Sequence, residues 1–313
     1  MEAQALIDPF ARLVADACPP AIVRAIEAGG DAQAAWDMFD QSGFLDALVP
    51  EGAGGAGLGL AEVAPLIALL GAHAVPLPVG ETMIARGLLA LADCAPPPGP
   101  IVLASGNGPA PLAKVAQYAL VAAGDGVALA PVASVVPTGV HHDLSGVIVA
   151  GATLATIAAP PGGLRPIAAV LRALLISGAT GRLLHMTVDY ANQRSQFGKP
   201  IGKLQAVQQQ LALLAEQSVA ARIAAEIGCR RGLAPSVLDA AIAKHGASVA
   251  AAEVAGIAHA VHGAIGVSEE YDLQLLTRAL HCWRLADGAE AYWAEMLGLA
   301  RAAREFGSID LLR

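Results

Sequence analysis

The segment YANQRSQFGKPIGKLQ, residues 190–205, concentrates polar and aromatic side chains in a chain otherwise dominated by Ala and Leu. Gly198 and Pro200 predict the end of one helix, and the run KLQAVQQQLALLAEQ predicts the next. An arginine at such a corner can bind a phosphate in bidentate fashion while a neighbouring phenyl ring stacks on a planar base. The alternative is that Arg194 caps the carbonyls of its own helix and Phe197 packs in the core.

Three glycines near the N-terminus have the spacing of a dinucleotide-binding turn. Gly52, Gly54 and Gly57 satisfy the pattern GxGxxG within VPEGAGGAGLGLAE. That pattern holds a pyrophosphate at a helix N-terminus when a strand precedes it and an acidic residue follows about twenty positions later. Neither feature is evident in the sequence, so we interpret the glycines as a permissive connecting loop.

The composition favours a chain of closely packed helices. The 313 residues are 55% hydrophobic but only 4% aromatic and 15% charged, so the apolar content is mainly small aliphatic side chains. We therefore expect much of the surface to be subunit interface. We find no uninterrupted apolar run long enough to span a membrane and no secretory signal, and we expect a cytoplasmic protein.

Charge and cysteine content narrow the partner classes further. A net charge of -8 and a pI near 5.4 disfavour a nucleic-acid partner, because phosphate neutralisation requires clustered Lys and Arg. The four cysteines lie far apart and lack metal-ligand spacing. We therefore expect reduced thiols and no metal site.

The chain divides into three zones by pattern. Residues 1–95 show apolar positions at helical spacing, residues 96–160 contain short β-branched runs separated by turn dipeptides, and residues 161–313 return to helical periodicity in four long blocks. The sequence predicts a mainly α fold: an N-terminal helical domain, a small, truncated β middle domain and a C-terminal antiparallel four-helix bundle.

Three motifs, in order along the chain, resemble the acyl-CoA dehydrogenase family. The strongest is YANQRSQFGKPIGKLQAVQQQLA (190–212), similar to the family signature Y-x-x-x-R-x-Q-F-G-x-P-I-x-x-x-Q. The second is HGAIGVSEEYDLQLLTR (262–278), and the third is GFLDALVPEGAGGAGLGLAEV (43–63), which resembles the family's V-P-E-x-x-G-G-x-G loop. The resemblance implies the same three-part fold that the zones predict.

The resemblance also implies a cofactor and a reaction. Family members bind FAD at a subunit interface and desaturate an acyl-CoA thioester between its α and β carbons. The Arg and Phe of the R-x-Q-F-G motif reach the FAD of the neighbouring subunit. The cofactor-binding positions that the resemblance implies here are Arg194, Gln196, Phe197, Gly198, Gln205 and Gly263. The acidic net charge is compatible with docking an electron-transfer flavoprotein as electron acceptor.

The position of the catalytic base holds a shorter carboxylate than the family's. In the family a Glu followed by Gly, nine residues after the Arg of the second motif, removes the α-proton. Counting from Arg278 gives Asp287, followed by Gly288. Asp withdraws the carboxylate by roughly 1 Å, and misplacement on that scale can cost about a hundredfold in rate. The alternative is that Asp287 is a helix N-cap or first-turn acid without a chemical role.

Several positions that would serve the chain's own flavin depart from the family pattern. The middle domain lacks the family's T-E-x-x-x-G-S-D stretch and its W-x-T element, and LASGNG (103–108) stands where the former would begin. Methyl groups replace family residues at four further positions: Ala260, Ala264, Ala279 and Ala289. In contrast, Arg194 and Phe197, which would serve the neighbour's flavin, remain.

This pattern predicts that the chain is one subunit of a hetero-oligomeric acyl-CoA dehydrogenase. We expect the partner chain to carry the base and the flavin face, and the assembly to act on a steroid or another bulky acyl-CoA. The alternatives are a self-sufficient homo-oligomer that uses Asp287, and a non-catalytic scaffold subunit. Two other family-pattern residues have structural interpretations: His262 as a packed, hydrogen-bonded histidine, and Glu270 as a first-turn helix acid.

Overall fold

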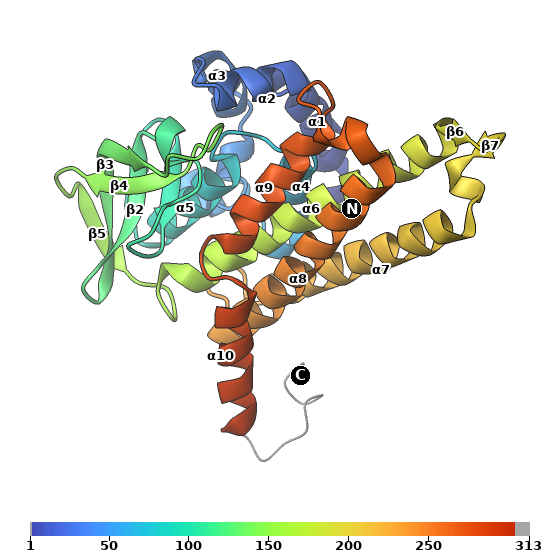
Figure 1. The fold of residues 1–313 in the computed structure, drawn as a ribbon. Helices are drawn as coiled ribbons and strands as arrows, with labels where there is room; N and C mark the ends of the chain where they lie inside the picture. The colour runs from blue at the N-terminus through green and yellow to red at the C-terminus, as the bar shows by residue number, and fades with distance from the viewer. Residues whose placement is uncertain (1, 304–313) are drawn as a thin grey trace.

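The computed structural model describes residues 2–303 and consists of helices around a small sheet (Figure 1). The sheet lies at the left of the view, the first N-terminal helices run along the top, and long helices extend to the right, away from the sheet (Figure 1). The fold class predicted from the sequence is confirmed, because N-terminal helices, a small sheet and a C-terminal bundle of long helices follow one another along the chain.

Five helices form the N-terminal part: α1 (Glu2–Ala17), α2 (Pro20–Glu27), α3 (Gln33–Asp40), α4 (Leu60–Ala72) and α5 (Val79–Leu91). Aromatic rings hold the first of them together, because Phe10 contacts Phe44 edge-on at 4.8 Å between ring centroids and also meets Phe39. The loop with GxGxxG spacing lies between a short 3₁₀ turn (Glu51–Ala53) and α4. Residues 2–100 contain no strand, so the loop lacks the preceding strand that a dinucleotide-binding turn needs. This agrees with our interpretation of it as a connecting loop.

The middle part is a five-stranded sheet of β1 (Ile101–Ala104), β2 (Tyr118–Ala123), β3 (Gly126–Pro137), β4 (Gly146–Ala150) and β5 (Ala155–Ala158). The order is β1-β2-β3-β4, with β5 also paired to β3, and only the β1–β2 pair is parallel. Strand β1 is buried along its whole length against the helices. The turn that follows β1 therefore emerges at the boundary between sheet and bundle.

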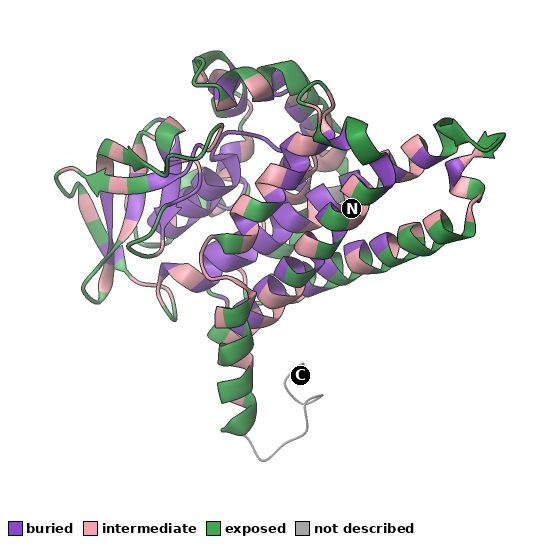
Figure 2. Ribbon diagram, in the orientation of Figure 1, coloured by how far each residue is buried: buried purple, intermediate pink, exposed green. Residues whose placement is uncertain are grey.

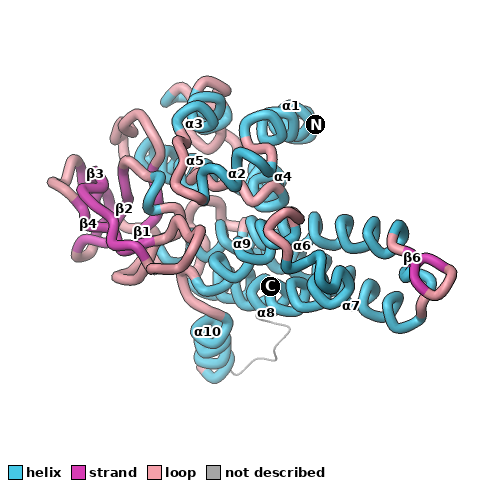
Figure 3. Tube along the Cα trace, turned by 45° about the horizontal axis from the view of Figure 1, so that its top comes forward, coloured by secondary structure: helices cyan, strands magenta, loops and turns pink. Residues whose placement is uncertain are grey.

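The C-terminal part is built on α6 (Leu164–Gln193), α7 (Gln205–Gly228), α8 (Val237–His262) and α9 (Leu273–Leu285), as Figure 3 shows. A two-stranded hairpin of β6 (Ser195–Gln196) and β7 (Lys199–Pro200) joins α6 to α7 at the tip farthest from the sheet (Figure 1). Helix α10 (Glu290–Ala302) projects from the end of α8 that lies away from the hairpin, and it is largely exposed (Figure 2).

Small residues let two helices touch backbone to backbone. A methyl group added at Gly178 of α6 would lie 1.7 Å from the carbonyl oxygen of Ala68 in α4, and one added at Gly71 would lie 2.0 Å from the oxygen of Leu175. The small-residue composition therefore reflects close helix crossing. Helices α6 and α8 are long and apolar enough to span a membrane, but both belong to the bundle core (Figure 2).

Candidate functional site

The hairpin between α6 and α7 presents the R-x-Q-F-G motif to solvent. Phe197 and Gly198 occupy its turn with φ values of 52° and 75°, the left-handed pair of a type I′ turn. The side chain of Phe197 is 87% exposed. The backbone of Arg194 is fixed on both sides, since its N–H donates to the Tyr190 carbonyl at 2.8 Å and its carbonyl accepts from the Ile201 N–H at 2.8 Å.

Arg194 is the C-cap residue of α6 through its backbone N–H, but the predicted alternative that Phe197 packs in the core is wrong. Phe197 is not in the core, and the exposed Arg194 side chain forms no hydrogen bond or ion pair within the described residues. A bulky apolar residue rarely adopts positive φ, because its Cβ crowds the neighbouring carbonyl. The fold therefore holds a free guanidinium and an exposed phenyl ring on a short, ordered platform.

The other predicted cofactor-binding positions lie at this same end of the bundle. Gln205 begins α7 and is exposed, and Gly263 ends α8 with a φ of 62°. A small buried cluster joins the three helix ends beneath the hairpin, and its members are Ala191, Ile201 and Val261. The Tyr190 hydroxyl donates to the His262 carbonyl at 3.2 Å, which ties α6 to the end of α8.

The two family-pattern residues with structural interpretations have different outcomes. His262 is 3% exposed, its Nδ1 lies 2.8 Å from the Ala258 carbonyl, and its ring stacks on Tyr190 at 4.4 Å, so it is the packed histidine that we predicted. The assignment of Glu270 to a helix first turn is wrong. Helix α9 begins at Leu273, and Glu270 lies in the preceding turn, where its carbonyl accepts from Arg24 at 3.3 Å.

Asp287 lies at the far end of the bundle, in the loop between α9 and α10, and both of its carboxylate oxygens are engaged. One oxygen accepts from Nε of Arg172 at 3.0 Å, and the other accepts from the hydroxyl of Ser105 at 2.5 Å. The N-cap of α10 is Ala289, so the interpretation of Asp287 as a helix N-cap is wrong. Its contacts instead join the α9–α10 loop to α6 and to the turn after β1.

Arg172 is the centre of a buried charge cluster. Its side chain is 0% exposed, and a second guanidinium nitrogen, Nη1, pairs with the Glu81 carboxylate of α5, which is 2% exposed. The third nitrogen, Nη2, is buried and has no hydrogen-bond partner. The attraction of Glu81 and Asp287 outweighs burial and raises the pKa of Arg172, so this cation is permanent.

A buried lysine amine holds the backbone of the same loop. The ammonium of Lys244 in α8 donates to the carbonyls of Arg284 at 2.7 Å and Gly288 at 2.8 Å, and to the Ser248 hydroxyl at 3.1 Å. Burial lowers the pKa of Lys244 to about 7. The indole Nε1 of Trp293 donates to the Asp287 carbonyl at 3.2 Å, so the loop is fixed on either side of its carboxylate.

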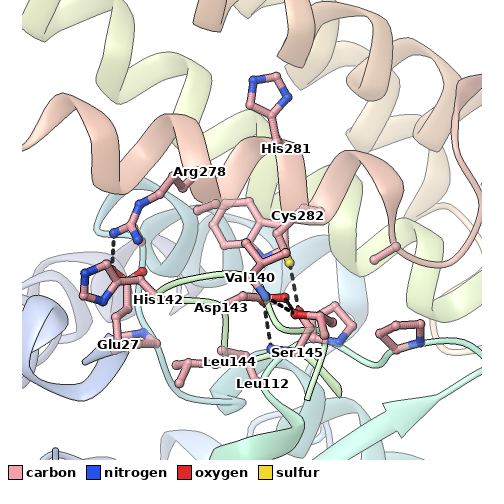
Figure 4. Close-up of a pocket in the computed structure, with 18 of the residues that line it drawn as sticks. Glu27, Leu112, Val140, His142, Asp143, Leu144, Ser145, Arg278, His281 and Cys282 are labelled. Carbon is pink, nitrogen blue, oxygen red and sulfur yellow. Dashed lines mark hydrogen bonds and ion pairs between the residues drawn. The ribbon is translucent and has the colours of Figure 1, made fainter. Parts of the chain in front are cut away.

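A cavity of about 500 Å³ lies between α9, the β3–β4 connection and the N-terminal helices (Figure 4). Its walls are mainly apolar, from Leu112, Val140 and Leu144 of the middle part to the side chains of α9. Two polar contacts join α9 to the elements opposite it: Arg278 donates to the Glu27 carboxylate, and the Cys282 sulfur lies 3.4 Å from the Ser145 hydroxyl (Figure 4). The sequence did not reveal this cavity, because its walls come from three separate parts of the chain.

A smaller cavity of about 220 Å³ lies beside Asp287. Its lining includes the turn after β1 (Ser105–Gly108), Asp287 itself and Arg165, whose guanidinium lies 5.1 Å from the centre of the Tyr292 ring. In this chain the LASGNG segment therefore serves the Asp287 carboxylate through Ser105. The described residues contain no cluster of side chains that could hold a metal ion.

Comparisons with known proteins agree with one another. Residues 168–302 match the family model described as acyl-CoA dehydrogenase, C-terminal domain. The acyl-CoA dehydrogenase IpdE2 of Mycobacterium tuberculosis is 32% identical over 294 residues, which cover 90% of this chain and 91% of that protein. The chain belongs to the acyl-CoA dehydrogenase family.

Solved structures of this family share the fold along the whole chain. A chain of the ChsE4–ChsE5 complex from Mycobacterium tuberculosis aligns with a TM-score of 0.83 at 21% identity, covering 97% of this chain and 98% of that one. A chain of the steroid acyl-CoA dehydrogenase Tcur3481–Tcur3483 aligns with a TM-score of 0.84 at 24% identity, covering 96% and 98%. Acyl-CoA dehydrogenases are oxidoreductases that act on acyl-CoA thioesters with FAD as cofactor.

The residues at the two ends of the bundle fit FAD unequally. The hairpin offers a free guanidinium for phosphate and an exposed ring for a base, which are the groups that the adenosine-diphosphate half of a dinucleotide requires. The Asp287 carboxylate is not available as a free base, because it is already paired with Arg172.

Proposed function

We propose that this chain is one subunit of a hetero-oligomeric, FAD-dependent acyl-CoA dehydrogenase. Its partner is a second chain of the same family, and the assembly introduces a double bond between the α and β carbons of an acyl-CoA thioester. The observation that carries the proposal is the hairpin: Phe197 is held at positive φ with its ring 87% exposed, beside the unpartnered side chain of Arg194.

The length of α6 places the hairpin too far from the chain's own α9–α10 loop to serve a flavin there. Arg172 and Arg194 lie near opposite ends of this helix, and the rise of 1.5 Å per residue separates them by about 33 Å. A side chain on the hairpin therefore cannot reach a flavin that lies beside the chain's own α9–α10 loop. It can reach a flavin that a neighbouring subunit presents, and Arg194 would hold the pyrophosphate there while Phe197 stacks on the adenine.

The catalytic base of the proposed assembly belongs to the partner. When bound, FAD would accept the β-hydrogen as hydride. The α-proton must go to a carboxylate aligned with the α-carbon. In this chain Asp287 is bound to Arg172 and Ser105 and is not free for that step. A self-sufficient homo-oligomer that uses Asp287 is therefore disfavoured by its contacts.

Further observations support a partner of the same family. Helix α7 exposes three aliphatic side chains to solvent by 42–48%, Leu213, Val219 and Ile223, as a helix does when a partner covers it. Two proteins with this fold are named as two-component assemblies, ChsE4–ChsE5 and the steroid enzyme Tcur3481–Tcur3483. We extend the proposal to a steroid or similarly bulky acyl-CoA, a cytoplasmic location and an electron-transfer flavoprotein as acceptor, for which the acidic net charge is the supporting feature.

The test is co-expression with any acyl-CoA dehydrogenase chain that is encoded beside this one. We expect a yellow hetero-oligomer that oxidises acyl-CoA, and a colourless chain when it is produced alone. The variant Arg194→Glu should lower the FAD content of the assembly, whereas Arg12→Glu, the same charge reversal on the exposed face of α1, should leave it unchanged. Stoichiometric FAD and turnover by the chain alone would refute the proposal.

A further inference from the structure

Tyr190 contacts both of the segments that carry the proposed dinucleotide-binding residues. Its backbone carbonyl accepts from the Arg194 N–H at 2.8 Å, which fixes the start of the hairpin. Its side-chain hydroxyl donates to the carbonyl of His262 at 3.2 Å, and His262 directly precedes Gly263 at the end of α8. One residue of α6 therefore joins the hairpin, through its backbone, to the end of α8, through its side chain.

The rings of Tyr190 and His262 are stacked on each other. Their centroids lie 4.4 Å apart, with 25° between the ring planes. The ring of Tyr271, in the turn before α9, meets the His262 ring at 5.3 Å. A stacked pair has a narrow range of favourable geometries, so it limits how far the two helix ends can slide past each other. The stack and the hydroxyl hydrogen bond together hold the ends of α6 and α8 in one register.

The surroundings of the His262 imidazole favour its neutral form. Its Nδ1 lies 2.8 Å from the Ala258 carbonyl, and its Nε2 is buried without a hydrogen-bond partner in the described part of the chain. Burial lowers the pKa of His262, and the neighbouring His259 lowers it further. The rings that face the imidazole from other elements are Tyr190 and Tyr271, so no carboxylate among the described residues compensates a charge there. Three charged side chains act one ring further out, on Tyr271: Asp272, Arg182 and Asp189.

We propose that Tyr190 and His262 are positioning residues for the dinucleotide. They hold the hairpin and the end of α8 in register, so that Arg194 and Gly263 contact one FAD of the partner chain together. The inference deepens the proposed function and rests on it for the FAD. Both residues act through the segments that they join, and a proton added to the buried imidazole weakens the connection, because it buries an unpaired charge.

The first test removes the Tyr190 hydroxyl and keeps the ring. In the assembly, Tyr190→Phe should speed FAD dissociation about 2- to 10-fold, the range expected for the loss of one hydrogen bond. The matched control is Tyr271→Phe, which removes a hydroxyl from the same group of rings without removing the hydrogen bond to His262. The control should dissociate at the wild-type rate. Equal rates in wild type and Tyr190→Phe would overturn the proposal.

The second test titrates His262. A histidine whose pKa is lower in the folded state contributes its full stabilisation above its ordinary pKa of 6.5, and this contribution is lost as the pH falls further. His262→Phe keeps a ring for the stack and removes the protonation site. Between about pH 8 and about pH 5, FAD dissociation should accelerate at least about threefold more in wild type than in this variant. The control His185→Phe removes an exposed imidazole of α6 and should keep the wild-type pH profile.

Hydrogen–deuterium exchange of the full chain reports the connection without flavin. Tyr190→Phe should speed amide exchange in residues 194–201 and residues 263–267 together, and leave exchange at the β2–β3 turn unchanged. Unchanged exchange in both segments would show that Tyr190 does not join them, which would overturn the proposal. If His262→Phe does not fold, Tyr190→Phe decides by this measurement and by FAD dissociation.

The outcomes separate this inference from the proposed function. If Arg194→Glu lowers the FAD content while Tyr190→Phe and His262→Phe behave as wild type, the positioning role is refuted and the proposed function stands. If Arg194→Glu leaves the FAD content unchanged, the partner-flavin proposal is refuted and the positioning of FAD with it. Coupled exchange of the two segments in that case would show that Tyr190 only joins the helix ends.

Discussion

Replacing Phe197 by Asn should stabilise the isolated chain and weaken the assembled enzyme. The backbone of Phe197 has a φ of 52°, a left-handed conformation that costs a bulky residue about 1 kcal/mol and that Asn adopts readily in a type I′ turn. The ring is 87% exposed, so its loss removes almost no buried area. The free energy of unfolding should therefore rise by about 0.5–1 kcal/mol, a shift of roughly 2 °C in Tm for a chain of this size.

The same substitution removes the ring that we propose stacks on the partner flavin's adenine. Stacking on an aromatic side chain contributes about 1–3 kcal/mol per base, so FAD should dissociate from the assembly about 5- to 150-fold more readily. Urea unfolding of the chain purified alone measures the first effect, and flavin fluorescence during dialysis of the assembly measures the second. Phe197→Leu is the control: it keeps the strained φ, so it should weaken FAD binding without stabilising the chain.

The refuting result is a change of sign in the unfolding experiment. If Phe197→Asn destabilised the isolated chain by more than about 1 kcal/mol, the ring would contribute to a packed core and the platform interpretation would fail. If FAD retention were equal in wild type, Phe197→Asn and Phe197→Leu, the hairpin would have no part in holding the dinucleotide.

Three other predictions concern the buried charges and the helix crossing. Arg172→Met alone leaves two buried carboxylates uncompensated and should lower the free energy of unfolding in urea by about 3–5 kcal/mol, while adding Glu81→Leu should recover part of that loss. Gly178→Ala places a methyl group 1.7 Å from the Ala68 carbonyl oxygen and should prevent soluble expression, measured by the soluble fraction after lysis. Burial lowers the pKa of Lys244 from its ordinary value of 10.5 to about 7, so the unfolded state binds more protons between these limits. Stability should therefore rise with pH from 7 to 10 by up to about 1.4 kcal/mol per unit, and Lys244→Met should flatten this slope in urea titrations at each pH.

The hairpin was predictable from sequence because its signal is local. Arg194, Phe197 and Gly198 lie within five positions, and Gly198 with Pro200 marks the helix end. The sequence alone did not decide between a core and an exposed position for Phe197. That choice depends on the left-handed turn, which two adjacent residues adopt together because the flanking strands twist.

The pairing of Asp287 was not predictable from its neighbours, because its partners are distant in sequence. Arg172 lies in the apolar run VLRALLIS, and Lys244 lies in the alanine-rich run AAIAKHGA. A lone cation in such a helix must find a buried partner, since an unpaired buried charge is strongly unfavourable. That rule could have marked both residues as members of a buried polar cluster, although it could not have named Asp287 and Glu81 as the acceptors.

The two ends of α6 together support the unlike partner that we propose for this chain. A homo-oligomer would bring each hairpin to a site in which Arg172 already holds Asp287, so it would combine intact dinucleotide contacts with no free base. A partner with an open site and a free carboxylate completes one reaction site for every two chains. We therefore expect the assembly to bind one FAD per pair of chains, and a measured ratio of one FAD per chain would contradict the proposed pairing of unlike chains.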